Sequence, residues 1–82
     1  MNLYTVRDYV AEEAGPVFEA KNDEVAKRNF VEILGKTALK PSDFGLYCIG
    51  VFDHDLMNMT AASPGGRLVC DGKQYEEFAD GK

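Results

Sequence analysis

Residues 16–35, PVFEAKNDEVAKRNFVEILG, contain the pattern that decides the fold. Apolar side chains recur at helical spacing after residue 24 and fall on one broad arc of a helical wheel. This apolar arc consists of Val25, Ala26, Phe30, Ile33 and Leu34. A helix of about three turns is marginal by itself in water, so it needs a sheet to cover its apolar arc.

Both ends of this helix are marked by capping residues. Asn22 is a favourable N-cap, because its side-chain oxygen accepts hydrogen bonds from free backbone N–H groups of the first turn. Asp23 and Glu24 follow it, where the helix dipole favours negative charge. Gly35 stands just past the last periodic residue and is expected to be a C′ glycine. The pattern predicts a helix over residues 22–34.

The segments before the helix are expected to be strands. Residues 2–10 alternate with period two and are rich in β-branched and aromatic side chains, which favours a strand. Residues 11–15 read as a polar connector that ends in a Gly-Pro breaker. Residues 17–21 then form a short strand that leads into the N-cap.

The longest strand is expected downstream of the helix. Residues 44–53, FGLYCIGVFD, are apolar on both faces, which indicates a central strand, and Gly50 within it suggests a bulge. His54-Asp55 falls where a hairpin turn belongs, and residues 56–62 form a second, weaker strand.

The C-terminal part adds less structure. A Ser-Pro-Gly-Gly loop precedes a short strand over residues 67–70. Residues 71–78 are expected to form one or two helical turns capped by Asp71, and residues 79–82 a frayed tail. The whole pattern predicts one α+β domain over residues 1–82, with a small, mainly antiparallel sheet packed on one central amphipathic helix. The order is ββαββ, followed by a short C-terminal strand and a helical turn.

Composition bears on the class of partner. The chain has 82 residues, 14 acidic and 9 basic, and a formal net charge of −5. Non-specific affinity for nucleic acid comes mostly from phosphate neutralisation by Lys and Arg, so the overall field of this chain opposes it. Composition alone therefore favours a protein partner. A domain this small often gains stability by pairing with a copy of itself, so a homodimer is expected.

The cysteines and the N-terminus indicate a reducing compartment. Cys48 and Cys70 are too few for a disulfide framework and are expected to be core thiols in the cytosol. Met1 leads directly into a strand-like alternation, so no signal peptide is expected. No apolar run approaches the length that spans a bilayer, so no membrane partner is expected.

Three motifs with reactive side chains have ordinary explanations. Asp53-His54-Asp55 offers metal-ligand side chains, but adjacent residues rarely converge on one ion, and a hairpin turn is favoured. A Cys–His pair with Cys48 needs a thiol within reach of the only imidazole and a third group to orient it. Gly65-Gly66-Arg67 lacks the spacing of a phosphate loop and favours a flexible turn. We expect no enzyme, no metal site and no cofactor.

One set of basic residues is a candidate for contact with nucleic acid. The set comprises Arg7, Lys21, Lys27 and Arg28. The first two lie on or near the first two strands, and the last two lie on the polar side of the helix. With Tyr4 and Tyr9 nearby, they would form a small surface that stacks bases and follows phosphates. The alternative is a solvated helix face with salt bridges, since Glu24 and Glu32 interrupt the set.

The order of several short motifs is familiar. Residues 20–30, AKNDEVAKRNF, follow an opening strand and Pro-Val-Phe, and precede PSDFGLYCIGVFD. The positions that carry the pattern are Pro16, Phe18, Ala20, Asn22, Asp23, Ala26, Arg28, Phe30, Pro41, Asp43, Phe44, Leu46, Tyr47, Gly50, Phe52 and Asp53. In this order the sequence resembles the small nonstructural protein of gokushovirus-like microviruses, which are tailless phages with single-stranded circular DNA genomes. The resemblance covers residues 1–53 well and the remainder loosely.

The resemblance implies a nonstructural, DNA-associated protein of the host bacterial cytoplasm. It implies a role in viral genome replication, in the switch from duplex to single-strand synthesis, and it attaches no catalytic residue to the chain. We expect a part in single-stranded DNA synthesis or packaging, with single-stranded DNA and viral or host replication proteins as partners. Two alternatives stay open: a protein-interaction module that binds a replication factor, and a minor assembly component.

Overall fold

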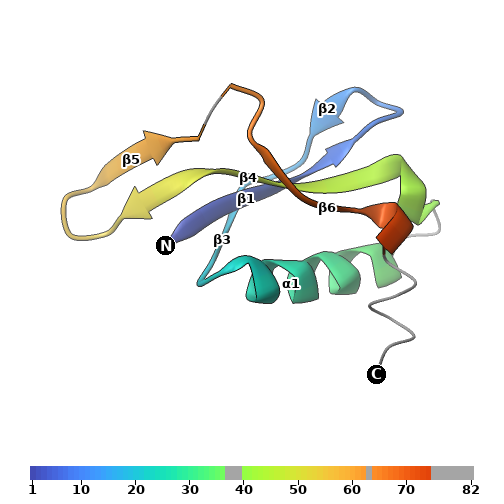
Figure 1. The fold of residues 1–82 in the computed structure, drawn as a ribbon, viewed down its shortest axis with the longest axis horizontal. Coiled ribbons are helices and arrows are strands. Elements are labelled where there is room, and N and C mark those ends of the chain that lie inside the picture. The colour runs from blue at the N-terminus through green and yellow to red at the C-terminus, as the bar shows by residue number, and fades with distance from the viewer. Residues whose placement is uncertain (37–39, 63, 75–82) are drawn as a thin grey trace.

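The chain folds as an α+β structure, as the sequence predicts (Figure 1). The computed structural model describes residues 1–36, 40–62 and 64–74. In chain order the elements are β1 (Asn2–Asp8), β2 (Glu13–Ala14), β3 (Phe18–Ala20), α1 (Asp23–Gly35), η1 (Pro41–Asp43), β4 (Phe44–Asp53), β5 (Asn58–Ala61), β6 (Arg67–Asp71) and η2 (Gly72–Gln74), where η is a 3-10 helix.

The sheet is built around the antiparallel pair of β1 and β4. The other edge of β1 pairs with β3 near its start and with β2 near its end. The other edge of β4 pairs with β6 near its start and with β5 near its end, and all of these pairings are antiparallel. The prediction of a central strand over residues 44–53 is confirmed. The short strand β2 was not predicted, because Gly15 and Pro16 were interpreted as the end of a connector. In the structure they interrupt the edge of the sheet, and β2 before them and β3 after them both pair with β1.

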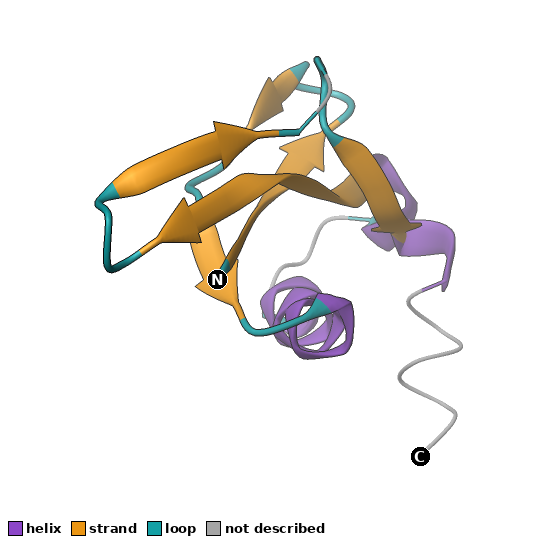
Figure 2. Ribbon diagram, turned by 60° about the vertical axis from the view of Figure 1, so that its left-hand side comes forward, coloured by secondary structure: helices purple, strands orange, loops and turns teal. Residues whose placement is uncertain are grey.

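One helix covers one face of the sheet (Figure 2). Ala26, Phe30 and Leu34 of α1 are buried and pack on the sheet. The largest fully buried side chains are Tyr4, Phe30 and Leu46, which come from β1, α1 and β4. The core therefore lies between the helix and the two central strands, as the apolar arc predicts.

The helix ends differ from each other in how well the sequence predicts them. Asn22 is the N-cap, and its Oδ1 accepts a hydrogen bond from the Val25 backbone N–H at 3.0 Å. The prediction that Gly35 is a C′ glycine is wrong. The helix continues through Gly35, and Lys36 ends it with a right-handed backbone (φ −96°, ψ −6°) and an N–H bonded to Ile33. No left-handed residue is needed at Gly35, because Lys36 closes the last turn itself.

The turn of the β4–β5 hairpin covers residues 54–57, and the prediction of a turn at His54-Asp55 is confirmed. Asp53 Oδ1 accepts hydrogen bonds from the backbone N–H groups of Asp55 and Leu56, which fixes the turn. The second strand starts two residues later than predicted, because Met57 has a positive φ of 52° and belongs to the turn.

The bulge in β4 lies beside the predicted glycine. Leu3 pairs with Gly50 whereas Tyr4 pairs with Cys48, so the residue between them in β4 is left without a partner in β1. This extra residue increases the local twist and curls the sheet over the helix.

The C-terminal strand is present one residue longer than predicted, and Asp71 Oδ1 accepts a hydrogen bond from the Lys73 N–H at the start of η2. The rest of the predicted helical turns and the predicted frayed tail, residues 75–82, lie outside the described residues. Among the residues described, no helix is both long and apolar enough to cross a bilayer.

Candidate functional site: two grooves on opposite faces of the sheet

Strand alternation separates two faces of the sheet. Tyr4 and Val6 of β1 belong to the core or pack against it, and we call their side the helix face. Thr5 and Arg7 alternate with them and lie on the opposite side, which we call the outer face. The described part of the chain places no helix over the outer face.

The outer face carries a shallow groove with a volume of about 340 Å³, the outer groove. Its lining residues come from β1, β2, β4 and β5 and from the segment that leads from β5 to β6. They are Thr5, Arg7, Ala14, Tyr47, Ile49, Ala61, Ala62, Pro64, Gly65 and Gly66. Among these described residues there is one cation and no carboxylate, although the chain as a whole is acidic.

A pair of tyrosines lies beside this groove. The Tyr9 and Tyr47 hydroxyl groups are 2.9 Å apart and hydrogen-bonded, and they approach the backbone of Gly45 closely. A Cβ atom at Gly45 would lie 2.2 Å from the Tyr9 hydroxyl oxygen, so a larger residue there would displace the Tyr9 ring from this position. Burial, followed by the Tyr47 hydrogen bond, raises the pKa of Tyr9 to about 12, although nearby Arg7 opposes the shift.

The four basic residues predicted to contact nucleic acid do not form one surface. Arg7 lines the outer groove, and no ion pair of Arg7 occurs among the described residues. Lys27 and Arg28 belong to α1, which packs on the opposite face, and Lys27 lies 3.4 Å from Glu24. Lys21 is exposed in the short link between β3 and α1. Helical periodicity correctly placed Lys27 and Arg28 on the same helix. It contained no information on which face of β1 is turned away from the helix.

The predicted aromatic contribution also changes. Tyr4 is fully buried and cannot stack on a base, because it faces the helix. Tyr9 is 39% exposed and lies next to Tyr47. Tyr47 was not predicted to be a surface residue, because its strand is apolar on both faces. The tyrosines available to a ligand are therefore Tyr9 and Tyr47, both beside Arg7.

The helix face contains a second and larger hollow, the acidic groove, with a volume of about 740 Å³. It lies between the C-terminal half of α1 and the strands β1, β2 and β3. Its described carboxylates are Asp8, Glu13, Glu19 and Glu32, and its one ammonium group is that of Lys36. The two grooves thus differ in charge as well as in position.

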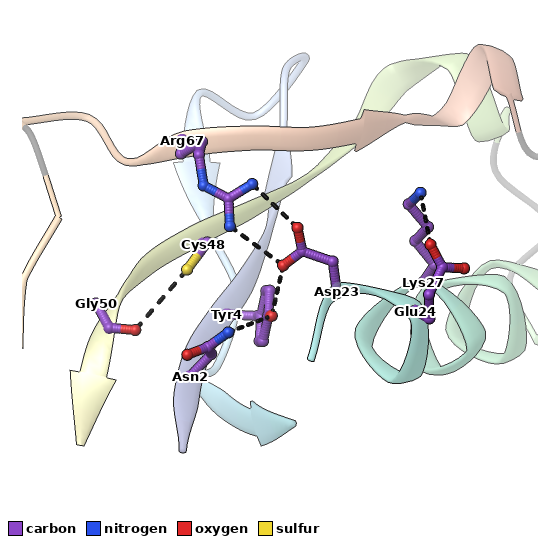
Figure 3. Close-up of polar contacts among 8 residues, drawn as sticks. All are labelled: Asn2, Tyr4, Asp23, Glu24, Lys27, Cys48, Gly50 and Arg67. Atoms are coloured by element: carbon purple, nitrogen blue, oxygen red, sulfur yellow. Dashed lines mark hydrogen bonds and ion pairs between the residues drawn. The ribbon is translucent and has the colours of Figure 1, made fainter. Parts of the chain in front are cut away.

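Arg67 has a structural partner that the sequence did not reveal (Figure 3). Its guanidinium donates two hydrogen bonds of 3.1 Å to the two carboxylate oxygens of Asp23, and the Tyr4 hydroxyl donates a third to Asp23 at 2.7 Å. The Arg67 hydrogen bonds, and then the Tyr4 hydrogen bond, lower the pKa of Asp23. This pairing ties the first turn of α1 to β6 and to β1, so the guanidinium at Gly65-Gly66-Arg67 serves the fold.

The remaining reactive side chains also have structural roles. His54 Nε2 lies 2.6 Å from Glu19 Oε2, and its ring packs edge-on against Phe52. Within the described ranges, no group of three or more His, Cys, Asp and Glu side chains is placed to hold a metal ion. Cys48 and Cys70 are buried and free of disulfides, as predicted for core thiols. Burial raises the pKa of the Cys70 thiol to about 11, so it is protonated at neutral pH.

Comparison with known proteins places the chain in one family. A family model described as phage ORF5 protein matches residues 1–75. No curated protein and no solved structure gave a significant match. Since the family match spans most of the 82 residues, the chain belongs to the phage ORF5 protein family.

Proposed function

We propose that this phage protein is a non-enzymatic accessory protein that associates with single-stranded DNA in the cytoplasm of the infected bacterium. Its role lies in the synthesis of the viral single strand, at the switch from duplex replication, or in its packaging. Membership of a phage family supports the general class. The resemblance to the nonstructural protein of gokushovirus-like microviruses supports the finer assignment.

The observation that carries the proposal is the chemistry of the outer groove. Proteins that bind single strands without sequence preference combine cations with aromatic side chains on which bases stack. Arg7 and Tyr47 line the outer groove together, and none of its described lining residues is acidic, although the charge of Asp71 acts on Tyr9 beside it. The two glycines of the adjoining turn have no side chains that would hinder an approaching backbone.

The net charge of −5 sets the expected strength of this contact. A single unpaired arginine neutralises about one phosphate, so direct binding will be weak and sensitive to salt. The protein therefore acts in concert with a replication or packaging partner that holds the DNA more firmly.

The test is fluorescence anisotropy with a labelled oligothymidine at low ionic strength. The wild-type protein is expected to bind, and affinity should fall as salt is added. Arg7→Gln should weaken binding and reduce the slope of log affinity against log salt by about 0.7, the value for one phosphate contact on a single strand. Arg28→Gln, which removes an equal charge from the helix surface, is the matched control and should bind like the wild type.

Two results would overturn direct DNA contact through the outer groove. One is no binding by the wild-type protein at low salt. The other is an equal loss in the Arg7 and Arg28 variants, because it would mean that only bulk charge matters.

The second candidate function is a protein-interaction module, which the β4–β5 hairpin favours. Leu56, Met57 and Met59 on this hairpin are 71%, 85% and 61% exposed, and Figure 1 shows the hairpin extending beyond the helix. Such apolar exposure is typical of a contact with another protein chain. Retention of a replication factor by the wild type, with loss in a Leu56→Ser/Met57→Ser variant, supports this candidate, whereas co-purification with capsids supports an assembly component.

We also propose a homodimer, which the free edge of strand β5 supports. Within the described residues β5 pairs with β4 alone, so its other edge is free for a second copy. Sedimentation equilibrium distinguishes the 9.1 kDa monomer from a species of twice that mass.

A further inference from the structure

We propose that the acidic groove binds a basic segment of a protein partner, one that carries apolar side chains between its lysines and arginines. The site lies on the opposite face from the outer groove and does not depend on DNA binding. Its evidence is the combination of an apolar floor, an acidic rim and the orientation of the helix.

The floor of the acidic groove is apolar. Val6, Phe18 and Phe44 are partly buried and pack against the core, and Ile33 completes the floor from α1. Ile33 is 44% exposed although it belongs to the apolar arc of the helix, and it lines the groove with residues of β1, β2 and β3. The sequence therefore provides an apolar side chain here that the fold leaves uncovered.

The rim of the acidic groove is negatively charged. Four acidic residues and one basic residue, Lys36, are among the residues that line it. Glu13 has no ion pair among the described residues, and the pairing of Glu32 with Lys36 is long, at 3.9 Å, and exposed. Glu19 contacts His54, and the Asp8 carboxylate accepts backbone hydrogen bonds from Val10 and Ala11.

The helix adds to this negative potential. The groove is lined by the last two turns of α1, and the last turn contains no basic residue before the cap. The unpaired carbonyl groups at a helix C-terminus carry a partial negative charge, which favours a cation. Helix end and rim thus attract the same kind of ligand.

Charge complementarity selects the occupant. A nucleic acid would bring phosphates against four carboxylates, and a second copy of this chain would bring a net charge of −5. The sequence of residues 75–82 has three side-chain carboxylates and one lysine, so the same charge argument applies to it. An apolar floor with a charged rim is the usual anatomy of a protein interface, so a basic, apolar-bearing polypeptide fits.

The experiment uses two synthetic peptides of equal length and equal leucine content, one with lysine and the other with glutamate at every polar position. Binding to the 15N-labelled full chain is followed by NMR. The lysine peptide should shift the amide signals of Phe18, Ile33 and Phe44, with an affinity that falls as salt is added. The glutamate peptide should shift none of them.

Two double variants separate the site from bulk charge. Glu13→Gln/Glu32→Gln removes two rim carboxylates and should weaken lysine-peptide binding about fivefold, as expected for two exposed ion pairs. Glu24→Gln/Asp55→Asn changes the net charge equally at positions outside the groove and should leave affinity unchanged. Ile33→Ala removes a floor contact without a charge change and should weaken binding as well.

Equal weakening by the two double variants, or shifts confined to the outer face or to the β4–β5 hairpin, would overturn the proposal. The Arg7→Gln variant tests whether DNA binding and peptide binding are independent. It should leave peptide binding intact, so failure of DNA binding and failure of peptide binding are distinguishable.

Discussion

The two faces of the sheet are formed by the same strands but differ in burial: the helix face contains the core, and the outer face has no helix over it in the described part of the chain. On the helix face, Tyr4 of β1 and Leu46 and Cys48 of β4 pack under α1. They form the buried core together with three residues of α1 and one residue each of β3 and β6. On the outer face, Arg7 and Tyr47 line the outer groove together with small side chains and glycines. The helix face thus provides most of the stability of the fold and also contains the acidic groove, whereas the outer face contains the outer groove.

Truncation of the helix core should have the largest effect. Phe30→Ala removes a fully buried ring and should lower the free energy of unfolding by about 3–5 kcal/mol, a large part of the stability of so small a domain. Leu68 pairs with Tyr47 on the outer face and is 49% exposed, so Leu68→Ala should cost under about 1 kcal/mol. Urea unfolding followed by circular dichroism measures both, and similar costs would contradict the division between the faces.

Alkaline pH should weaken the core through Cys70. Burial raises the pKa of this thiol from 9.0 to about 11, so the folded state holds the proton more tightly than the unfolded chain. The protonated thiol therefore contributes stability that is fully present below pH 9 and is lost as the pH rises through about 11. A difference of two pKa units between the folded and unfolded states corresponds to roughly 3 kcal/mol in the free energy of unfolding.

Urea midpoints between pH 8 and pH 11 measure this effect. A Cys70→Ala variant should show a shallower fall over the same range, because it has no thiol to ionise. Parallel curves for the variant and the wild type would assign the alkaline loss to other groups, such as Tyr9 on the outer face, whose raised pKa acts at higher pH.

The tie between α1 and β6 should have an intermediate effect. Asp23→Asn weakens the paired hydrogen bonds from Arg67 and should cost about 1–2 kcal/mol, allowing for partial exposure of the carboxylate. Glu24→Gln removes the neighbouring carboxylate, which is 79% exposed, and should cost far less.

The pH dependence of this difference provides a second check. Because the folded-state pKa of Asp23 is lowered, its contribution is present above the ordinary value of 3.8 and is lost as the pH falls through the lower folded value. The difference in stability between wild type and Asp23→Asn should therefore shrink below about pH 4. A constant difference would indicate that the carboxylate charge is unimportant.

The turn over the outer groove should show the smallest difference. Gly65 and Gly66 both have positive φ angles, of 84° and 76°, so alanine is strained at either position, by roughly 1–2 kcal/mol. A Cβ atom at Gly66 would also lie 3.0 Å from the Cys48 carbonyl oxygen, whereas at Gly65 it would meet nothing within 4 Å. Gly66→Ala should be the less stable variant by a few tenths of a kcal/mol in thermal unfolding, and the reverse order would be inconsistent with this turn.

Local features of this protein were accessible from the sequence. The apolar arc of residues 25–34, the N-cap Asn22 and the span of β4 follow from spacing and from side-chain chemistry that acts over a few residues. The turn after β4 followed for the same reason, since Asp53 bonds to backbone groups two and three residues ahead. Where the end of an element depended on the conformation of its neighbours, as at Gly35 and Met57, the sequence placed it incorrectly.

The binding surfaces required the tertiary structure. Period-two alternation separates Arg7 from Val6, but only the docking of α1 determines which of the two faces the core. The pairing of Asp23 with Arg67 joins residues 44 positions apart, and the acidic groove brings β1, β2, β3 and the end of α1 to one place. Short-range propensities act along the chain and cannot encode such contacts, which are fixed by the curl of the sheet and by burial of the helix against it.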